Sequence, residues 1–411
     1  MALIILIAAL WRWSPAANPA VQINNLGFES LQIAYSLAHG QGFANPFADL
    51  QSGPTAHLAP VFPFLLSFVI RWFGDASRAI AVIDWMGVLA AGLQLSLWPF
   101  AARRLGMGFW SGALGAGLWL TFGLVPRTVW EADYVAVLVI VLSMAMYKIL
   151  TERSSTAYIA STAAIWGLTI LASPVVFLPF VVLALCGIFI GNINGKQKLV
   201  LVAIPLLVLT PWTIRNYRAF HHIFLVRDNL GLELSVSNNE CAEFSLIANQ
   251  LTSCYVHPNE DPQEAARFRS MGEYAYNQER LRQAVHWIAE NPRRFGSLTL
   301  ERAVAFWFPN GSGNPFTSQV DWNVKVLWAI TLFSFPGLVL LWWRNRIAAL
   351  ICLIWLIFFP PVYYLIQFDV RYRTPIMWAS LIPAAYLFVR VGKELFASRA
   401  GRTQPAASVE R

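Results

Sequence analysis

Long apolar segments joined by short connectors constrain the fold of this chain more than any other feature. Nine of them follow one another from residue 78 onward, with one long polar stretch between residues 217 and 323. A helix needs about 20 apolar residues to cross the hydrocarbon core of a membrane. The chain is 57% hydrophobic and 13% charged, whereas a soluble domain carries about 25% charged residues. We therefore predict an all-α polytopic membrane protein. The predicted spans are 78–102, 107–126, 132–150, 156–173, 175–191, 198–214, 324–343, 347–366 and 374–391.

Basic residues gather in alternate connectors, and this sets the expected orientation. If every segment from residue 78 onward crosses the membrane, 13 basic residues fall on one side: Arg103, Arg104, Lys148, Arg153, Lys196, Lys198, Arg344, Arg346, Arg390, Lys393, Arg399, Arg402 and Arg411. The opposite short connectors hold only Arg127, Arg371 and Arg373. Cytoplasmic loops are enriched in Lys and Arg, so we expect the 13 in the cytoplasm and residues 217–323 outside. This bias explains the net charge of +8 without a nucleic-acid partner.

The N-terminal segments leave the number of spans at ten or eleven. Residues 2–13 are apolar but too few to cross the membrane, so either this segment reaches only partway or the sequence lacks its true N-terminus. If the segment runs outward, Pro60–Phe73 does not cross and must be interfacial or re-entrant. If the N-terminus lies outside, Pro60–Phe73 is a span. Charge counting does not separate these topologies because the N-terminal segment contains almost no Lys or Arg.

The order of apolar and polar segments divides the chain into four expected parts. They are an N-terminal transmembrane module with catalytic outer loops at 1–216, an extracytoplasmic loop domain at 217–323, C-terminal transmembrane helices at 324–392 and a cytoplasmic tail at 393–411. In the loop domain, Asp261–Pro262 predicts a helix to about Glu290. Asn291–Pro292 predicts a second helix through Phe308 on the same grounds.

The chain has four cysteines with two expected roles. Cys186 and Cys352 lie within apolar segments and are expected to be packing residues. Cys241 and Cys254 lie in the long polar stretch. They are expected to form a disulfide if that loop faces an oxidising compartment.

The first outer loop opens with a predicted amphipathic helix, Phe28–His39. Its apolar stripe has helical spacing and consists of Leu31, Ala34, Tyr35 and Ala38. Glu29 and Gln32 lie on the opposite side, and Gly40 and Gly42 end the helix. An apolar stripe would anchor this helix to the bundle, so Glu29 is expected to face the outer cavity.

Polar side chains gather in the connectors expected to face outward. They are Glu29 and His57 in the first loop, Glu131 and Asp133 in the second connector, Arg215 at the start of the long loop, and Arg371 and Arg373 in the last connector. Arginine neutralises a phosphate leaving group, and a carboxylate deprotonates a hydroxyl. The set is typical of group transfer from a phosphate-linked donor to a hydroxyl acceptor.

Each of these residues also has a purely structural interpretation. Glu29 fits a solvated helix position, and the acids of the second connector fit the N-terminal turn of a helix. Arg215 fits a helix end at the interface, and the two arginines of the last connector fit side chains that reach for lipid headgroups. Arginine on the outer side runs against the positive-inside bias, so the last connector favours a functional role.

Six stretches carry a family resemblance: FESLQIAYSLAHGQGF, GPTAHLAPVFPFLLSFVIRWFG, RTVWEADY, TPWTIRNYRAFHHIFLVRDNLGLEL, ENPRRFGSLTLERAVAFWF and DVRYRTPIMW. In this order they resemble the GT-C superfamily of polyprenyl-phosphate-dependent glycosyltransferases. The match is to the bacterial family 39-like group, related to protein O-mannosyltransferases and the lipid A aminoarabinose transferase. The resemblance implies a transmembrane helical bundle with interfacial helices in its first outer loop and an extracytoplasmic active site.

The resemblance also implies roles for single residues. The family carries an essential acid in its first outer loop, usually aspartate, and Glu29 stands at the matching place as the expected general base. In the oligosaccharyltransferase branch a second acidic motif helps to bind metal; it resembles Glu131–Asp133, so a divalent ion there, Mg²⁺ or Mn²⁺, is left open. The expected donor phosphate contacts are Arg371, Arg373 and Arg215, and the expected first-loop substrate contacts are His57 and Gln32.

Together these expectations describe a glycosyltransferase of the bacterial inner membrane. It would move a sugar from a polyprenyl-phosphate donor to a hydroxyl of a lipid, glycan or protein acceptor by inverting displacement on the extracytoplasmic side. Two rivals are a flippase or transporter of lipid-linked sugars and a non-catalytic accessory membrane protein. A transporter needs polar groups at mid-membrane, whereas polar residues concentrate here at the outer ends of the spans, which favours the enzyme.

Overall fold

A computed structural model describes residues 1–23, 27–48, 50–310 and 321–402. Helices are the regular elements throughout these ranges. The N-terminal helices are α1 (Ala2–Arg12), α2 (Glu29–Ala38), α3 (Val61–Phe73), α4 (Ala76–Arg104), α5 (Phe109–Phe122), α6 (Ala132–Thr151), α7 (Thr156–Ala172), α8 (Phe177–Ile190) and α9 (Gly195–Phe220). Five helices follow: α10 (Leu230–Ser237), α11 (Leu246–Leu251), α12 (Pro262–Met271), α13 (Glu273–Glu290) and α14 (Pro292–Trp307). The last are α15 (Trp322–Arg344), α16 (Arg346–Phe358), α17 (Pro361–Leu365) and α18 (Met377–Arg402), with 3₁₀ turns η1 (Pro19–Val21), η2 (Pro174–Val176) and η3 (Val370–Ile376).

The all-α membrane architecture predicted from the sequence is confirmed. Among the described residues, six helical stretches are long and apolar enough to cross a membrane: Ala76–Arg104, Ala132–Thr151, Gly195–Phe220, Trp322–Arg344, Arg346–Leu365 and Val370–Glu394. The sequence predicted ten or eleven spans, and several are shorter than expected. The span predicted at 156–173 is α7, with 17 residues, which rises about 26 Å at about 1.5 Å per residue. It ends there because Ser173 precedes Pro174 and adopts an extended conformation.

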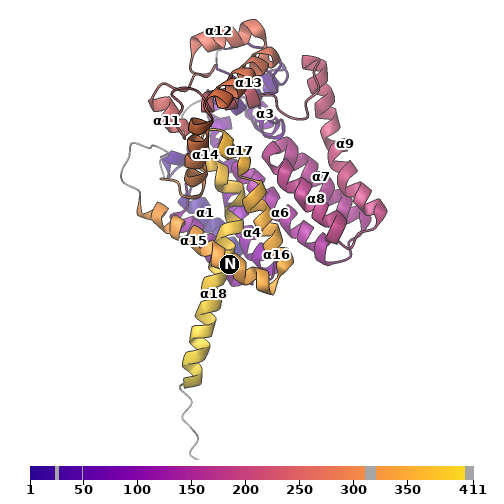
Figure 1. Ribbon diagram of the computed structural model, residues 1–411, viewed down its shortest axis with the longest axis vertical. Helices are drawn as coiled ribbons and strands as arrows, with labels where there is room; N and C mark the ends of the chain where they lie inside the picture. The colour runs from indigo at the N-terminus through magenta and orange to yellow at the C-terminus, as the bar shows by residue number, and fades with distance from the viewer. Residues whose placement is uncertain (24–26, 49, 311–320, 403–411) are drawn as a thin grey trace, which may run out of the picture.

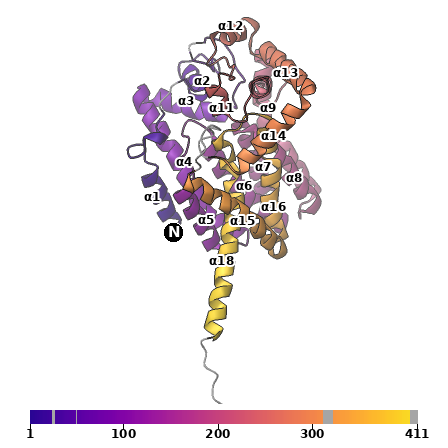
Figure 2. The same cartoon turned by 60° about the vertical axis from the view of Figure 1, so that its left-hand side comes forward.

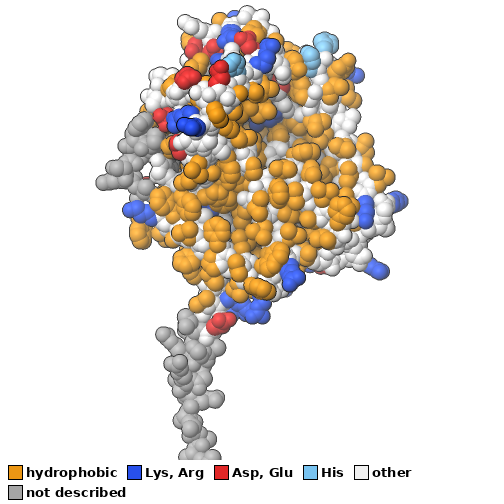
Figure 3. Space-filling model, in the orientation of Figure 1, with side chains coloured by type: hydrophobic (Ala, Val, Ile, Leu, Met, Phe, Trp, Pro, Cys, Tyr) orange, Lys and Arg blue, Asp and Glu red, His pale blue; other side chains and the backbone are white. Residues whose placement is uncertain are grey.

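The basic connectors meet at one end of the bundle, called here the basic end. Arg104 at the end of α4 pairs with Glu152 after α6 at 2.6 Å. Asn345, between α15 and α16, donates to the carbonyl of Leu105 at 3.2 Å and to the Tyr147 hydroxyl at 2.8 Å. Figure 3 shows a broad band of hydrophobic side chains, with Lys and Arg along its lower border. This arrangement agrees with the predicted separation of basic connectors from the polar loops.

The opposite end, called here the loop end, joins the first loop to the second connector. The carboxylate of Asp84 in α4 accepts a hydrogen bond from the Thr128 hydroxyl at 2.7 Å and from the backbone N–H of Ile23 at 3.4 Å. The same Thr128 hydroxyl lies 3.0 Å from the carbonyl of Val21. A buried acid near the end of a span thus fixes two loops.

Helix α3 lies beside α2 and is too short to cross a membrane. Its 13 residues rise about 20 Å at about 1.5 Å per residue. One face is buried by Phe62 and Leu66, while Phe68 and Trp72 on the other face are exposed. A short apolar helix with one open apolar face is typical of an interfacial helix, which is the topology that the resemblance implies for this segment.

The outer helices α11–α14 cover the loop end, and α18 extends from the opposite end (Figures 1 and 2). The sequence predicted one helix from Pro262 to about Glu290, which is wrong at Gly272. This glycine has φ +77° and ψ 154°, a backbone conformation that ends α12 and starts α13. Glycine adopts positive φ at little cost, so it allows this break. The second predicted helix is present as α14.

Candidate functional site

Helix α2 places Glu29 at the loop end. The predicted apolar stripe is confirmed, because Leu31 and Ala34 are fully buried in a cluster with α3 and α4, and Tyr35 packs against it. Glu29 is the first residue of the helix and is partly buried. Gln32 lies one turn later with intermediate exposure. The helix ends at His39, followed by Gly40 with φ +78°.

The remainder of the first loop is held by residues from distant parts of the chain. Arg215 of α9 donates to the carbonyls of Thr55 and Phe43, each at 2.7 Å. The backbone N–H of Ala56 donates to Glu273 of α13 at 2.5 Å. These bonds fix the peptide group that joins Thr55 to Ala56, directly before His57.

Three chemically active side chains converge on this framework. One ligand-capable atom from each of Glu29, His57 and His257 lies within 4.8 Å of the others. The two imidazoles are each 2% exposed. Their rings pack around Phe47, with centroid distances of 5.0 Å for His57 and 5.2 Å for His257. The structure therefore brings together the predicted acid, the predicted first-loop histidine and a second histidine from the outer region.

Glu29 has an electrostatic environment of mixed sign. Burial raises its pKa to about 7; the nearby charge of Glu233 adds to this rise, while the Glu29 backbone N–H, Arg371 and Arg227 oppose it. Burial also raises the pKa of Glu233, whose carboxylate accepts from Asn229 at 3.0 Å. A carboxyl with a pKa near neutrality can both take and release a proton at ordinary pH.

The two histidines are held as neutral rings. Burial lowers the pKa of His57 well below its usual range, and the proximity of Arg227 and His257 lowers it further. Burial also lowers the pKa of His257 to about 3, with a further contribution from Arg280. Neutral imidazole keeps a lone pair on one ring nitrogen, so each ring is able to accept a hydrogen bond or bind a metal.

Arg371 interacts electrostatically with both acidic motifs. Glu29 and Glu131 both contribute to its electrostatic environment. Its guanidinium stacks on Trp130 and pairs with Asp369 at 3.5 Å. Of the three arginines predicted to contact the donor phosphate, Arg371 is the one whose charge also acts on Glu29.

The other two arginines have different surroundings. Arg215 lies over Trp212, 4.9 Å from the ring centroid, and donates to the first-loop carbonyls. The guanidinium of Arg373 donates to the carbonyl of Trp307 at 2.8 Å and to the hydroxyls of Thr331 and Ser380 at 3.0 and 3.3 Å. These contacts describe positioning of the protein backbone, and phosphate binding by either residue stays a prediction.

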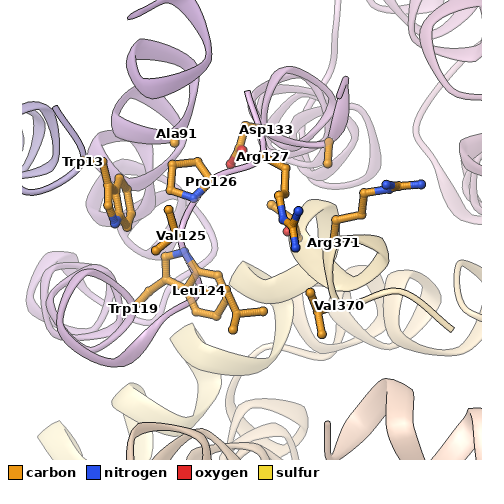
Figure 4. A pocket seen from close by; sticks show the side chains of 12 residues that line it. Trp13, Ala91, Trp119, Leu124, Val125, Pro126, Arg127, Asp133, Val370 and Arg371 are labelled. Atoms are coloured by element: carbon orange, nitrogen blue, oxygen red, sulfur yellow. The ribbon is translucent and has the colours of Figure 1, made fainter. Parts of the chain in front are cut away.

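The second acidic motif lies across a small cavity from the aromatic end of α1. Asp133 accepts a hydrogen bond from Gln94 at 2.5 Å and is 6% exposed. The cavity holds about 20 Å³ and is lined by Trp13, Arg127, Asp133 and Arg371, among others. A volume of that size suits about one water molecule. Figure 4 shows Arg127 next to Asp133, while the Arg371 guanidinium points away from Trp13.

The predicted disulfide between Cys241 and Cys254 is present. The loop that it closes leads from α10 past α11 toward the histidine cluster. Ser245, within that loop, forms a parallel bridge with Phe368 before η3. The disulfide thus braces the part of the outer region that lies between α10 and His257.

Three of the solved structures that are similar to this chain are oligosaccharyltransferases of the archaeon Archaeoglobus fulgidus. The Archaeoglobus fulgidus oligosaccharyltransferase in its apo form aligns with 98% of this chain and 51% of its own, at 15% identity and a TM-score of 0.56. The same organism's AglB, in complex with an inhibitory peptide and a dolichol-phosphate, aligns with 100% and 52%, at 15% identity and a TM-score of 0.53. Its complex with Zn and sulfate aligns with 96% and 49%, at 14% identity and a TM-score of 0.52.

The chain has the GT-C fold. It spans about half the length of the structures that it matches. No protein-family model and no curated protein matches it in sequence. Within this GT-C fold the Glu29 site lies between the first loop and the outer helices, and its contacts come from segments more than 200 residues apart, such as Ala56 and Glu273.

Sequence reasoning missed two members of the candidate site, His257 and Glu233. Both lie in the 217–323 stretch. Glu233 falls within TPWTIRNYRAFHHIFLVRDNLGLEL, where no spacing distinguishes it from its neighbours, and neither periodicity nor motif spacing marks His257. Tyr255, whose ring stacks on His257 at 5.0 Å, was missed for the same reason. A usable signal was the sequence YVHP, an aromatic and a histidine within a short polar loop, but this pattern by itself specifies no partner.

Proposed function

We propose that this protein is a glycosyltransferase that uses a polyprenyl-phosphate sugar as donor and a hydroxyl as acceptor. The reaction takes place on the extracytoplasmic side, at the loop end. The observation that carries this proposal is the joint position of Glu29 and Arg371, a carboxylate and an arginine in one electrostatic environment at the mouth of a GT-C bundle.

The two groups have complementary tasks in a single displacement. The acceptor oxygen attacks the anomeric carbon of the sugar, the bond from that carbon to the phosphate oxygen breaks, and the configuration inverts. Glu29 takes the proton of the acceptor hydroxyl. Arg371 neutralises the negative charge that the departing lipid phosphate carries. His57 and Gln32 are proposed as contacts for the substrate beside Glu29.

The exposed face of α3 suits the lipid part of the donor. Phe64, Phe68 and Trp72 lie on this face, next to the first loop that carries the site. Aromatic and apolar side chains at a membrane interface are compatible with an isoprenoid chain. The proposal places the chain along α3 with its phosphate toward Arg371. The dolichol-phosphate in the A. fulgidus complex supports a donor of this class.

Purified protein in liposomes, supplied with a labelled sugar on undecaprenyl or dolichyl phosphate and a mixed acceptor extract, tests the proposal. Transfer of label from the lipid carrier to an acceptor supports it. Movement of the intact labelled lipid between leaflets would indicate a transporter. Absence of both transfer and movement would indicate an accessory protein. Protein-free liposomes give the background of both processes.

A further inference from the structure

The last connector, between α17 and α18, is held by the outer region, α10–α14, on both sides of Arg371. Helix α14 lies beside α17 (Figure 1). Before Arg371, the carbonyl of Leu365 accepts a hydrogen bond from Arg302 of α14 at 3.1 Å. After it, Arg373 donates to the carbonyl of Trp307, at the end of α14, at 2.8 Å. One helix of the outer region therefore fixes the connector at two points, and Arg371 lies between them.

Arg302 is the unusual member of this arrangement. Its side chain is 0% exposed. Its guanidinium donates to the Asn238 side-chain oxygen at 3.0 Å and to the carbonyls of Leu365 and Ser237. None of these acceptors is charged, and the Nε of Arg302 has no partner among the described residues. Burial of a charged group in this way costs free energy, and an apolar side chain is often better tolerated. The presence of an arginine here therefore calls for a functional explanation.

The chain just after α17 is bound to the outer region as well. The N–H of Gln367 donates to the Ser237 hydroxyl at 2.8 Å. The carbonyl of Phe368 accepts from the N–H of Leu246 in α11 at 3.0 Å. Since Arg302 donates to the carbonyl of the same Ser237, it joins α10, α14 and the start of the last connector at one buried point.

Asp369 connects this buried point to the arginine of the site. Its carboxylate accepts a hydrogen bond from the N–H of Arg371 at 3.0 Å, which caps η3, and pairs with the Arg371 guanidinium at 3.5 Å. Asp369 follows directly after Phe368, so a shift of the connector at its start moves Asp369 and the guanidinium with it. The contacts of α14 therefore help to set the position of Arg371 relative to Glu29.

We propose that Arg302 is a positioning residue for sugar transfer, which holds the last connector where Arg371 reaches the donor phosphate. This inference rests on the proposed function for the role of Arg371, whereas the placement of the connector is independent of it. Arg302 acts through Arg371 and takes no part in the chemistry. An arginine suits this task because its planar fork reaches several acceptors from one position, whereas a lysine presents a single ammonium group.

Donor kinetics of two variants test this role. Arg302→Met keeps an unbranched side chain but removes its donors, and Ser237→Ala removes the acceptor of the Gln367 N–H. Both should raise the donor KM, by about 3–10-fold in Arg302→Met, because a misplaced Arg371 loses part of its hydrogen bonding to the phosphate. Arg302→Lys should give a donor KM between those of the wild type and Arg302→Met.

Arg294→Met is the matched control for these variants. Arg294 lies on the same helix, is exposed, and donates to the carbonyl of Ala242 at 2.9 Å rather than to the last connector. Its donor KM should equal that of the wild type. An unchanged donor KM in both Arg302→Met and Ser237→Ala overturns the proposal.

A double-mutant cycle separates positioning from a general loss of structure. If Arg302 acts through Arg371, Arg302→Met should change the donor KM by less than about twofold in the Arg371→Ala background. A variant that only loosens the fold would raise the donor KM by the same factor in both backgrounds. Equal factors in the two backgrounds therefore overturn the positioning role.

Hydrogen exchange of the full-length protein in detergent gives a readout that needs no activity. Residues 366–373 should exchange faster in Arg302→Met and Ser237→Ala than in the wild type, but not in Arg294→Met. If Arg302→Met does not fold, Ser237→Ala decides the result. Unchanged exchange at these residues overturns the proposal whether or not sugar is transferred. Faster exchange in a protein whose wild type transfers no sugar would contradict the proposed function and support the placement of the connector by Arg302.

Discussion

The guanidinium of Arg371 lies over the indole ring of Trp130, with its central carbon 3.8 Å from the ring centroid. Trp130 precedes α6 and Arg371 lies in the last connector, so this contact joins two loops that are far apart in sequence. Stacking of this kind uses the face of the guanidinium and leaves its edges for hydrogen bonds. Arg371 is thereby oriented next to both acidic motifs.

Replacing Arg371 should weaken donor binding. Hydrogen bonds to charged groups contribute about 1.5–3 kcal/mol, so Arg371→Ala should raise the donor KM by about 10–100-fold. Arg371→Lys keeps the charge but loses the fork geometry of the guanidinium, so its donor KM should lie between those of the wild type and Arg371→Ala. Steady-state kinetics with labelled donor measures this. Arg218→Ala, an exposed arginine on α9, is the matched control, and an unchanged donor KM in Arg371→Ala would assign Arg371 to headgroup contact instead.

Arg373 gives a different expected result in the same assay. Its guanidinium is buried and bonded to Trp307, Thr331 and Ser380. Arg373→Ala leaves these groups unpaired, so its melting temperature should fall clearly below that of the wild type. A raised donor KM at an unchanged melting temperature would instead favour the phosphate role predicted from the sequence.

The contrast between these two arginines shows which features of the fold and the site the sequence can predict and which it cannot. Helix α2 follows from its apolar spacing, the shared basic end from the placement of Lys and Arg, and the disulfide from two cysteines in one loop. The partners of Arg373 and the approach of His257 to Glu29 depend on contacts between segments far apart in the chain, which no local period encodes. The break at Gly272 was missed because a glycine within a helical pattern does not reveal its φ angle.

The disulfide between Cys241 and Cys254 should stabilise the outer region. The two cysteines are 13 positions apart, and closing a loop of about that size contributes about 3 kcal/mol. Mass spectrometry of unreduced protein should show the two peptides joined. Cys241→Ser with Cys254→Ser should increase proteolysis between α10 and α12. Free thiols at both positions in protein from an oxidising compartment would refute the prediction.

Asp228 and Glu273 should make stability depend on pH. Burial raises the pKa of both carboxyls, and their mutual proximity raises that of Glu273 further. Raised values mean that the folded protein binds more protons than the unfolded chain. The two carboxyls therefore contribute fully to the stability of the folded protein below their ordinary pKa values of 3.8 and 4.5. This contribution is lost as the pH rises through their higher pKa values in the folded protein.

Glu273→Gln removes one of these ionisations while retaining an oxygen for the Ala56 N–H. The decline of melting temperature with rising pH should therefore be shallower in Glu273→Gln than in the wild type. Thermal unfolding followed by intrinsic fluorescence between about pH 5 and 8 measures the slope. Glu279→Gln, on the same helix, is the control; an identical slope in Glu273→Gln and the wild type would show that the pair does not titrate in this range.

The orientation of the chain is a separate prediction. Positions in 40–53 and 217–323 should be extracytoplasmic, and Lys196 should be cytoplasmic, because the basic connectors meet at the end opposite the polar loops. Single cysteines introduced at the exposed residues Gln41 and Lys196, in a protein without its native thiols, should label from outside only at Gln41. Labelling at Gln41 only after permeabilisation would reverse the N-terminal half of this topology.

The most direct measurement of the central claim is the turnover of Glu29→Gln. Glutamine keeps the size and hydrogen bonding of the side chain but does not take the proton of the acceptor. General base catalysis contributes about 10²–10⁴-fold, so turnover should fall by about that factor while donor binding, measured separately, is retained. Glu29→Asp should lose less. Wild-type turnover in Glu29→Gln, together with inactive Glu131 or Asp133 variants, would place the base on the second connector and contradict the role of Glu29.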